Sequence, residues 1–289
     1  MNVLTRAQQD QFWRDGVLIV DNAVTPAQLT ALRDQFADWV EQSRHHAKAY
    51  GETLDGRPRF DVEPGHSADR PALRRVSAPA DVSDIFHEVV VNSQMGDMVA
   101  DLIGPDVKHH HNKINSTLPG AATEVKWHQD FLFTPHSNTD LVTALLMLDD
   151  VTADNGPLKV VPGSHRGALH SLWHDDRFTG AVSEAQAADL EKAAVRCLGS
   201  AGSVCLMHTC VAHGSAPNHS PHPRTLFITV YAAADALPYS PNPVPNRHEG
   251  LIVRGQDPGT IRTTAHQLRL PAFPRGASFF SRRTIRGHP

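Results

Sequence analysis

The tetrapeptide Trp127-His128-Gln129-Asp130 places an imidazole and a carboxylate two residues apart. In an extended strand, residues i and i+2 point to the same face, so His128 and Asp130 can converge on one metal ion. A third ligand from a distant strand would complete a set of two histidines and one carboxylate. Such a set leaves coordination positions open, which is typical of non-haem iron(II) oxygenases.

The third ligand is predicted to be His213, which begins a segment rich in turn-forming residues that runs to Arg224. A strand before this segment and a strand after it would form a hairpin-like unit. Its rivals for the same role are His208, His219 and His222. The His-x-Asp pattern also recurs at His174-Asp175-Asp176, where the polar neighbours indicate a surface loop.

The elements that must position these residues are mainly short strands between residues 107 and 235. Gly, Pro, Asn and Asp interrupt the apolar runs, of which the clearest are 141–148, 158–161, 203–207 and 225–232. Helices are predicted at 4–10, from Thr25 as N-cap onward, over 83–102, and as an insertion at 183–195. A short strand is predicted at 16–20, and residues 50–80 read as a long loop. The pattern indicates an all-β core with helical additions, either a β-sandwich or a jelly roll.

Composition excludes several function classes. Of 289 residues, 40% are hydrophobic and 20% charged, and a net charge of −4 gives no reason to expect a nucleic-acid partner. Three cysteines do not form a disulfide framework and fit a reducing compartment. We find no signal-peptide pattern and no apolar run long enough to cross a membrane, so we expect a cytoplasmic location. The sequence does not predict the oligomeric state.

Four segments together resemble the phytanoyl-CoA dioxygenase family of iron(II)/2-oxoglutarate oxygenases, which includes ectoine hydroxylase. They are residues 15–20, 127–130, 155–165 and 213–224, and they occur in the family's order. Arg224 follows His213 by the family's spacing of eleven positions (224 − 213). The resemblance covers most of residues 4–235 and does not reach the last part of the chain.

The resemblance implies a double-stranded β-helix, a cupin-like jelly roll, with N-terminal helices packed on one sheet. It implies iron(II) held by His128, Asp130 and His213, and oxidative decarboxylation of 2-oxoglutarate to succinate and CO2, with O2 as oxidant and ascorbate as reductant in vitro. Arg224 would bind the far carboxylate of 2-oxoglutarate, with Ser215 and Asn115 as further contacts. Halogenating relatives have a small residue in place of the carboxylate ligand, so Asp130 indicates hydroxylation, with desaturation or ring formation as alternatives.

We expect one domain over residues 1–289, with a helical part to about 105, the β-helix core at about 106–235 and an extension at about 236–289. In the strand before the iron motif, a period of two puts His109, His111, Lys113 and Asn115 on one face. If Asn115 faces the pocket, His111 and Lys113 would bind a small polar or anionic substrate; the more common role of such a polar strand face is contact with solvent. Phe131 and Phe133 are expected in the core.

Two other functions use the same three ligands. A jelly-roll hydrolase or isomerase would bind another metal and would not need Arg224. A non-catalytic module of this fold would bind a carboxylate but release no succinate.

Overall fold

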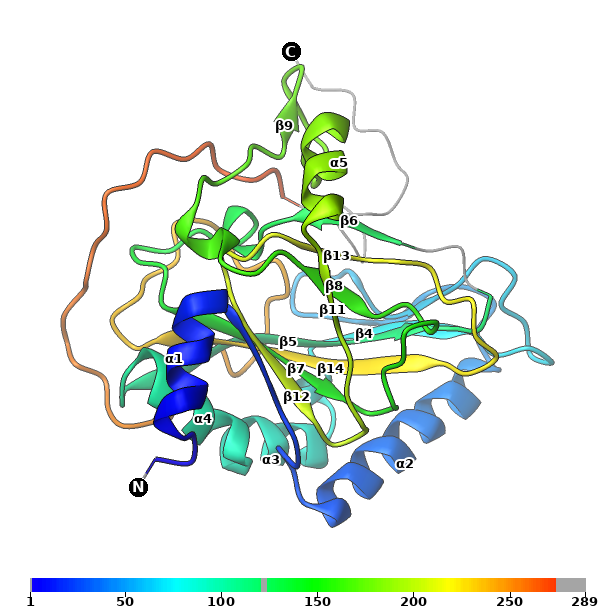
Figure 1. The fold of residues 1–289 in the computed structure, drawn as a ribbon. Coiled ribbons are helices and arrows are strands. Elements are labelled where there is room, and N and C mark those ends of the chain that lie inside the picture. The colour runs from blue at the N-terminus through cyan, green and yellow to red at the C-terminus, as the bar shows by residue number, and fades with distance from the viewer. Residues whose placement is uncertain (1, 121–123, 274–289) are drawn as a thin grey trace.

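The architecture has three layers, formed by helices, a large sheet and a small sheet (Figure 1). The computed structural model describes residues 2–120 and 124–273. The α-helices are α1 (Arg6–Asp15), α2 (Pro26–Ser43), α3 (Asp84–Asn92), α4 (Gln94–Ile103) and α5 (Glu184–Lys192). The first four lie against the outer face of the large sheet, whereas α5 lies beyond the small sheet.

The large sheet has nine strands in the order β1-β12-β7-β14-β5-β4-β3-β2, with β15 also paired to β5. All of its pairings are antiparallel. Its strands are β1 (Val17–Val20), β2 (Tyr50–Glu52), β3 (Pro58–Val62), β4 (Leu73–Ser77), β5 (Val107–Thr117), β7 (Leu141–Met147), β12 (Val204–His208), β14 (Arg224–Ala233) and β15 (Ile252–Arg254).

The small sheet has four strands in the order β11-β8-β13-β6 and faces the large one. Its strands are β6 (Val125–His128), β8 (Leu158–Val160), β11 (Val195–Cys197) and β13 (His213–Ser215), and a separate hairpin pairs β9 (Trp173–His174) with β10 (Arg177–Phe178). Two antiparallel sheets that pack face to face in this way form the jelly roll that the sequence resemblance implied.

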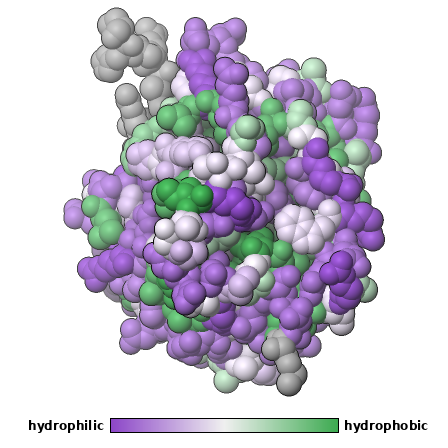
Figure 2. Space-filling model, turned by 90° about the vertical axis from the view of Figure 1, so that its left-hand side faces the viewer, coloured by the Kyte–Doolittle hydropathy of each residue, from purple (hydrophilic) through white to green (hydrophobic). Residues whose placement is uncertain are grey.

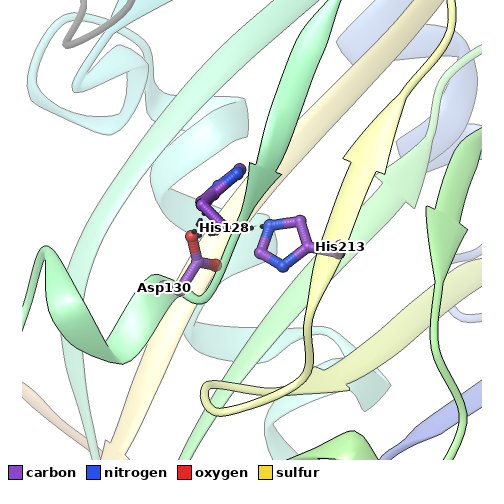
Figure 3. Close-up of side chains that lie close together, drawn as sticks. All are labelled: His128, Asp130 and His213. Atoms are coloured by element: carbon purple, nitrogen blue, oxygen red, sulfur yellow. Dashed lines mark ion pairs between the residues drawn. The ribbon is translucent and has the colours of Figure 1, made fainter. Parts of the chain in front are cut away.

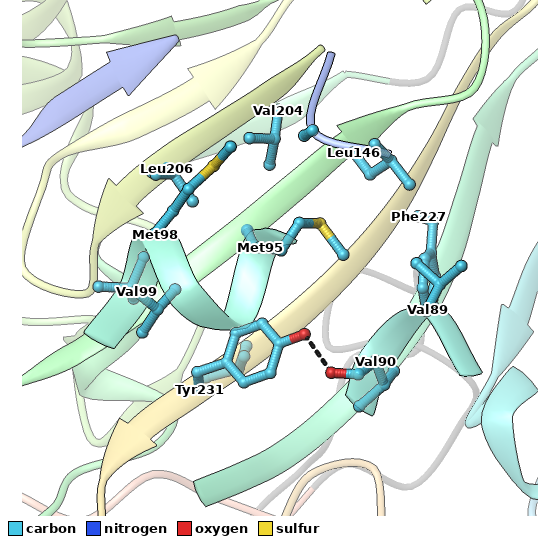
Figure 4. Close-up of a cluster of buried hydrophobic side chains, with 14 of the residues drawn as sticks. Val89, Val90, Met95, Met98, Val99, Leu146, Val204, Leu206, Phe227 and Tyr231 are labelled. Carbon is cyan, nitrogen blue, oxygen red and sulfur yellow. Dashed lines mark hydrogen bonds between the residues drawn. The ribbon is translucent and has the colours of Figure 1, made fainter. Parts of the chain in front are cut away.

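Strand β14 is buried along its whole length because it lies between the helices and the small sheet. On its helix side, Phe227 contacts the Phe86 ring at 4.8 Å between centroids, and the Tyr231 hydroxyl donates to the Val90 carbonyl at 2.8 Å (Figure 4). On its other side, Ile228 faces the small sheet and the metal-binding residues. The same strand therefore joins the apolar core to the functional site.

Two predictions about the N-terminal part are wrong. Residues 50–80 do not form a long loop but supply β2, β3 and β4, whose short polar stretches pair at the edge of the large sheet. The helix expected at 83–102 is two helices, because Ser93 is extended (φ −78°, ψ 165°) and its hydroxyl donates to the Val89 carbonyl. The N-terminal part therefore contains strands of the large sheet as well as helices.

The helix starts at Thr25 and Ser183 are confirmed, since both residues form capping boxes at the start of α2 and α5. The extension after residue 236 is partly packed on the core, as expected. Its strand β15 pairs with β5, and Arg262 forms ion pairs with Asp140 and Asp235. The part of this extension from residue 274 onward lies outside the described residues.

Apolar side chains lie mostly inside the molecule. The face in Figure 2, the left-hand side of Figure 1, is mainly hydrophilic, with apolar side chains in small scattered groups. Among the described residues, no helix has the length and hydropathy needed to cross a membrane.

Three buried histidines outside the metal site make stability depend on pH. Burial is the main cause that lowers the pKa of His109 to about 4, of His136 to about 4 and of His208 to about 3. The folded protein keeps them neutral, whereas the unfolded chain protonates them near pH 6.5. The free energy of unfolding should therefore fall as pH falls from about 6.5 towards 4, by up to about 1.4 kcal/mol per pH unit for each histidine.

Urea unfolding between pH 7.5 and 5 measures this slope. His136→Asn should reduce the slope, and His45→Asn, at an exposed position, should leave it unchanged. Equal slopes in the two variants would show that the buried His136 does not contribute to the pH dependence of stability.

Candidate metal centre

The three predicted metal-binding side chains meet between the two sheets (Figure 3). The Nε2 atom of His128 lies 3.5 Å from Asp130 Oδ1, and the Nε2 atom of His213 lies 3.6 Å from the same oxygen. One ligand atom from each residue lies within 4.8 Å of the others. Within residues 2–120 and 124–273, this is the one group of three or more His, Cys, Asp or Glu side chains close enough to hold an ion.

Strand pairing brings the two histidines together. His128 ends β6 and stands directly opposite His213 on β13. Gly214 follows His213 where the strands approach closely, because a Cβ atom there would meet the Val125 carbonyl oxygen at 2.8 Å. The glycine therefore lets β13 pack against β6 with both imidazoles on one side.

Asp130 lies just past the strand, at the start of the short 3-10 helix η2 (Asp130–Leu132), and not on the strand as expected. The same-face prediction still holds because Gln129 remains extended (φ −126°, ψ 127°). The Gln129 side chain points away from the metal site, where it donates to the Cys210 carbonyl at 2.8 Å and accepts from the His170 N–H at 2.8 Å. These bonds fix the segment that carries both ligands.

Backbone carbonyls set the tautomers of the two histidines. His128 Nδ1 lies 2.7 Å from the Lys126 carbonyl, and His213 Nδ1 lies 3.0 Å from the Val211 carbonyl. Because a carbonyl oxygen only accepts, each Nδ1 carries the proton and each Nε2 presents its lone pair towards Asp130. Both lone pairs are available for a metal ion, the arrangement common to metal-binding histidines.

The carboxylate of Asp130 is oriented by Thr143 on β7, whose hydroxyl donates to Oδ2 at 3.0 Å. This bond leaves Oδ1 facing the two Nε2 atoms. Burial opposes ionisation of Asp130, but His213, His128 and Lys113 outweigh it and hold its pKa below the ordinary range. Burial also lowers the pKa of His213 to about 4, so this ligand is neutral at pH 7. Two imidazoles and one carboxylate fit a divalent iron ion.

Replacing Thr143 by valine should weaken iron(II) binding by about 10- to 100-fold, the usual effect of removing a partner of a metal ligand. Competition with a chromogenic chelator measures this affinity. The matched control is Thr229→Val, which removes a buried hydroxyl that has no hydrogen-bond partner among the described residues. Equal iron affinity in the two variants would show that Thr143 does not position Asp130.

The rival histidines lie elsewhere. His208 accepts from the Cys210 N–H and packs against Trp13, and His174 bonds to the Ala181 carbonyl. His219 and His222 are exposed on the turn before β14.

Arg224 begins β14 and is buried, with 5% of its surface exposed. Its Nη2 donates to the Gly156 carbonyl at 2.7 Å, and its Nε is buried without a hydrogen-bond partner among the described residues. Burial lowers its pKa to about 10, so the guanidinium remains charged at pH 7. Ser215 is also buried, and its hydroxyl accepts from the Val125 N–H at 3.3 Å.

A cavity of about 60 Å³ adjoins two of the three ligands, His128 and Asp130. His111 and Lys113 line it, as predicted for pocket residues, whereas Asn115 is not among the described residues that line it. The expectation for His109 is wrong. A strand irregularity at residue 110 turns His109 to the other face, where it bonds to Asn112 at 3.0 Å.

Sequence reasoning missed further residues of this cavity, among them Arg75, Thr143 and Phe133. Phe133 is buried as expected of a core residue, yet it also lines the cavity. Thr143 had a detectable signal, since it is the one polar residue in the apolar run 141–148. Arg75 had no such signal, because the surrounding segment is rich in arginine.

Comparison with known proteins gives the family. The model of the phytanoyl-CoA dioxygenase (PhyH) family matches residues 12–226. A probable alpha-ketoglutarate-dependent hypophosphite dioxygenase of Stutzerimonas stutzeri is 33% identical over 204 residues, covering 69% of this chain and 71% of that protein. An ectoine dioxygenase of Bordetella bronchiseptica is 25% identical over 247 residues, covering 80% of this chain and 76% of that protein.

The fold is likewise similar to that of a solved relative. The crystal structure of EctD from S. alaskensis with 2-oxoglutarate and 5-hydroxyectoine matches with a TM-score of 0.66 and 22% identity, covering 81% of this chain and 77% of that one. Iron is bound in another crystal structure of the same protein. The chain thus belongs to the phytanoyl-CoA dioxygenase family and is a non-haem iron(II)- and 2-oxoglutarate-dependent dioxygenase.

Proposed function

We propose that this enzyme hydroxylates a small polar or anionic organic substrate, with iron(II) at His128, Asp130 and His213 and the far carboxylate of 2-oxoglutarate at Arg224. The observation that carries the proposal is the convergence of two Nε2 lone pairs on the one oxygen of Asp130 that Thr143 does not bind. The names of the hypophosphite and ectoine dioxygenases described above indicate that these relatives act on small polar molecules.

The role of Arg224 rests on its burial and charge. No carboxylate lies within ion-pair distance of it among the residues that the structure describes, and its buried Nε lacks a partner. An uncompensated buried cation is costly, and a planar guanidinium binds a carboxylate through two parallel hydrogen bonds. The distal carboxylate of 2-oxoglutarate would satisfy this charge.

Ser215 and Asn115 are proposed as further contacts of 2-oxoglutarate. The Ser215 hydroxyl accepts from a backbone N–H and so keeps its own proton to donate. Asn115 stands opposite Leu226, and Arg224 stands opposite Thr117, so Asn115 shares the inner face of the large sheet with Arg224.

Bound iron, 2-oxoglutarate and O2 together supply the oxidative decarboxylation and the oxygen atom that is inserted into a substrate C–H bond. The protein's own residues orient and shield the reactants. Thr143 holds Asp130 in position, while Phe133 and Ile228 form apolar walls of the cavity. Asp130 occupies the position that a halide would need, which favours hydroxylation.

Anaerobic titration with iron(II) and 2-oxoglutarate tests the proposal, because the chelate gives a weak visible charge-transfer band. After oxygen and ascorbate are added, succinate should form. A hydrolase or isomerase would give no such band, and a non-catalytic module would give no succinate. Either result would contradict the proposed function.

A further inference from the structure

The cavity beside the metal ligands contains two positively charged side chains that are not part of the metal centre. Lys113 on β5 and Arg75 on β4 both line it together with His128 and Asp130. Arg75 pairs with Asn115 in the sheet and Lys113 pairs with Ser77, so Arg75 and Lys113 are diagonal neighbours on the same face. Both lie deep in the protein, yet each remains partly exposed because it faces the cavity.

Neither cation has a carboxylate partner. Across residues 2–120 and 124–273, no carboxylate lies within ion-pair distance of Arg75 or Lys113, and the Arg75 Nε is buried without a hydrogen bond. Asp61, which stands opposite Arg75 in the sheet, is bound to Arg74 at 2.7 Å instead. Asp130 also lines this cavity but belongs to the metal site, so two further like charges there are unfavourable unless a bound anion neutralises them.

We infer that Arg75 and Lys113 bind an oxyanion head group of the substrate, a specificity role that rests on the proposed function. A carboxylate and a phosphorus oxyacid share the required chemistry, since both present several acceptor oxygens to a guanidinium and an ammonium group. His111 on the same face adds a neutral imidazole that can donate one further hydrogen bond.

The charges at the site support this assignment. A ferrous ion held at this site would be neutralised by Asp130 and the near carboxylate of 2-oxoglutarate, and the far carboxylate would be neutralised by Arg224. The charges of Arg75 and Lys113 are then left for the substrate. Burial lowers the pKa of Lys113 to about 8 and that of Arg75 to about 10, so both are mainly protonated at pH 7.

The size of the cavity favours a compact group. Its volume of about 60 Å³ suits a head group of a few atoms. Its remaining walls include Ile228, Val230 and Val244, which offer no counter-charge.

The experiment uses the full chain with iron(II) and 2-oxoglutarate under anaerobic conditions. Hypophosphite, methylphosphonate, acetate and neutral acetamide are added in separate titrations, and the change in the charge-transfer band gives the apparent affinity for each. We expect at least one anion to perturb the band and acetamide not to do so. A response to hypophosphite or methylphosphonate would indicate a phosphorus oxyacid head group, and a response to acetate would indicate a carboxylate.

Variants then test the residues. Arg75→Gln and Lys113→Met should each weaken the anion's affinity by at least about tenfold, the factor expected for one charge-assisted hydrogen bond. The affinity for 2-oxoglutarate should stay within about twofold of wild type, since these residues contact only the substrate. Matched controls are Arg70→Gln and Lys48→Met, both at exposed positions.

The outcomes separate the two proposals. If the wild-type band forms but no anion changes it, or if the variants bind the anion as wild type does, the inference is overturned and the proposed function stands. Weaker 2-oxoglutarate binding in both variants would assign the two residues to the cosubstrate and also overturn the inference. If the wild-type protein gives no band, the proposed function itself fails.

Discussion

His213→Ala is expected to lower succinate formation by more than about a hundredfold, because loss of a ligand should exceed the 10- to 100-fold effect of losing a ligand's hydrogen-bond partner. Iron(II) binding should weaken in parallel. His213 supplies one of the two Nε2 atoms that face Asp130, and within the described residues no other histidine lies close enough to replace it. Steady-state succinate formation and chelator competition measure the two effects.

The control for this variant is His174→Ala, which alters the second His-x-Asp sequence of the chain. His174 bonds to the Ala181 carbonyl in the hairpin of β9 and β10, away from the ligands. Its replacement should leave iron affinity and succinate formation near wild type. Comparable losses in both variants would contradict the assignment of His213 as a ligand.

Arg224→Gln is expected to raise the KM for 2-oxoglutarate by about 30-fold or more, the effect of removing one partner of a buried charge pair. Lysine at this position would keep the charge without the planar fork and should restore binding only in part. Initial rates at varied 2-oxoglutarate and saturating iron(II) measure the change.

A structural effect of Arg224 must be separated from binding, because its Nη2 also bonds to the Gly156 carbonyl. The Tm of Arg224→Gln without cosubstrate reports this effect. Arg177→Gln, at an exposed position on β10, is the matched surface control. An unchanged KM in a folded Arg224→Gln protein would remove the basis for the 2-oxoglutarate site.

The metal ligands could be predicted from sequence because their geometry is local. An extended Gln129 is enough to put His128 and Asp130 on one side, even though the strand ends at His128. The hairpin expected around the turn-rich segment after His213 does not form, because β13 pairs with β6 and β8 of the small sheet whereas β14 pairs with β5 and β7 of the large sheet. The resemblance to the family then identified Arg224 from its distance in sequence to His213.

Features that depend on tertiary pairing were not predictable. Strands β2 to β4 carry many polar residues, and only pairing with the edge of β5 makes them part of the sheet. Arg75 reaches the cavity through this pairing. The reversal of His109 arises because residue 110 has no partner of its own on β14, an irregularity that a simple period of two cannot reveal.

The most direct measurement is a crystal structure of the full chain grown anaerobically with iron(II) and 2-oxoglutarate, with anomalous data collected at the iron edge. The account predicts one strong peak bound by His128 Nε2, His213 Nε2 and Asp130 Oδ1, with the diacid's far carboxylate on Arg224. An iron peak that lacks any of these three ligands, or a diacid bound away from Arg224, would contradict it.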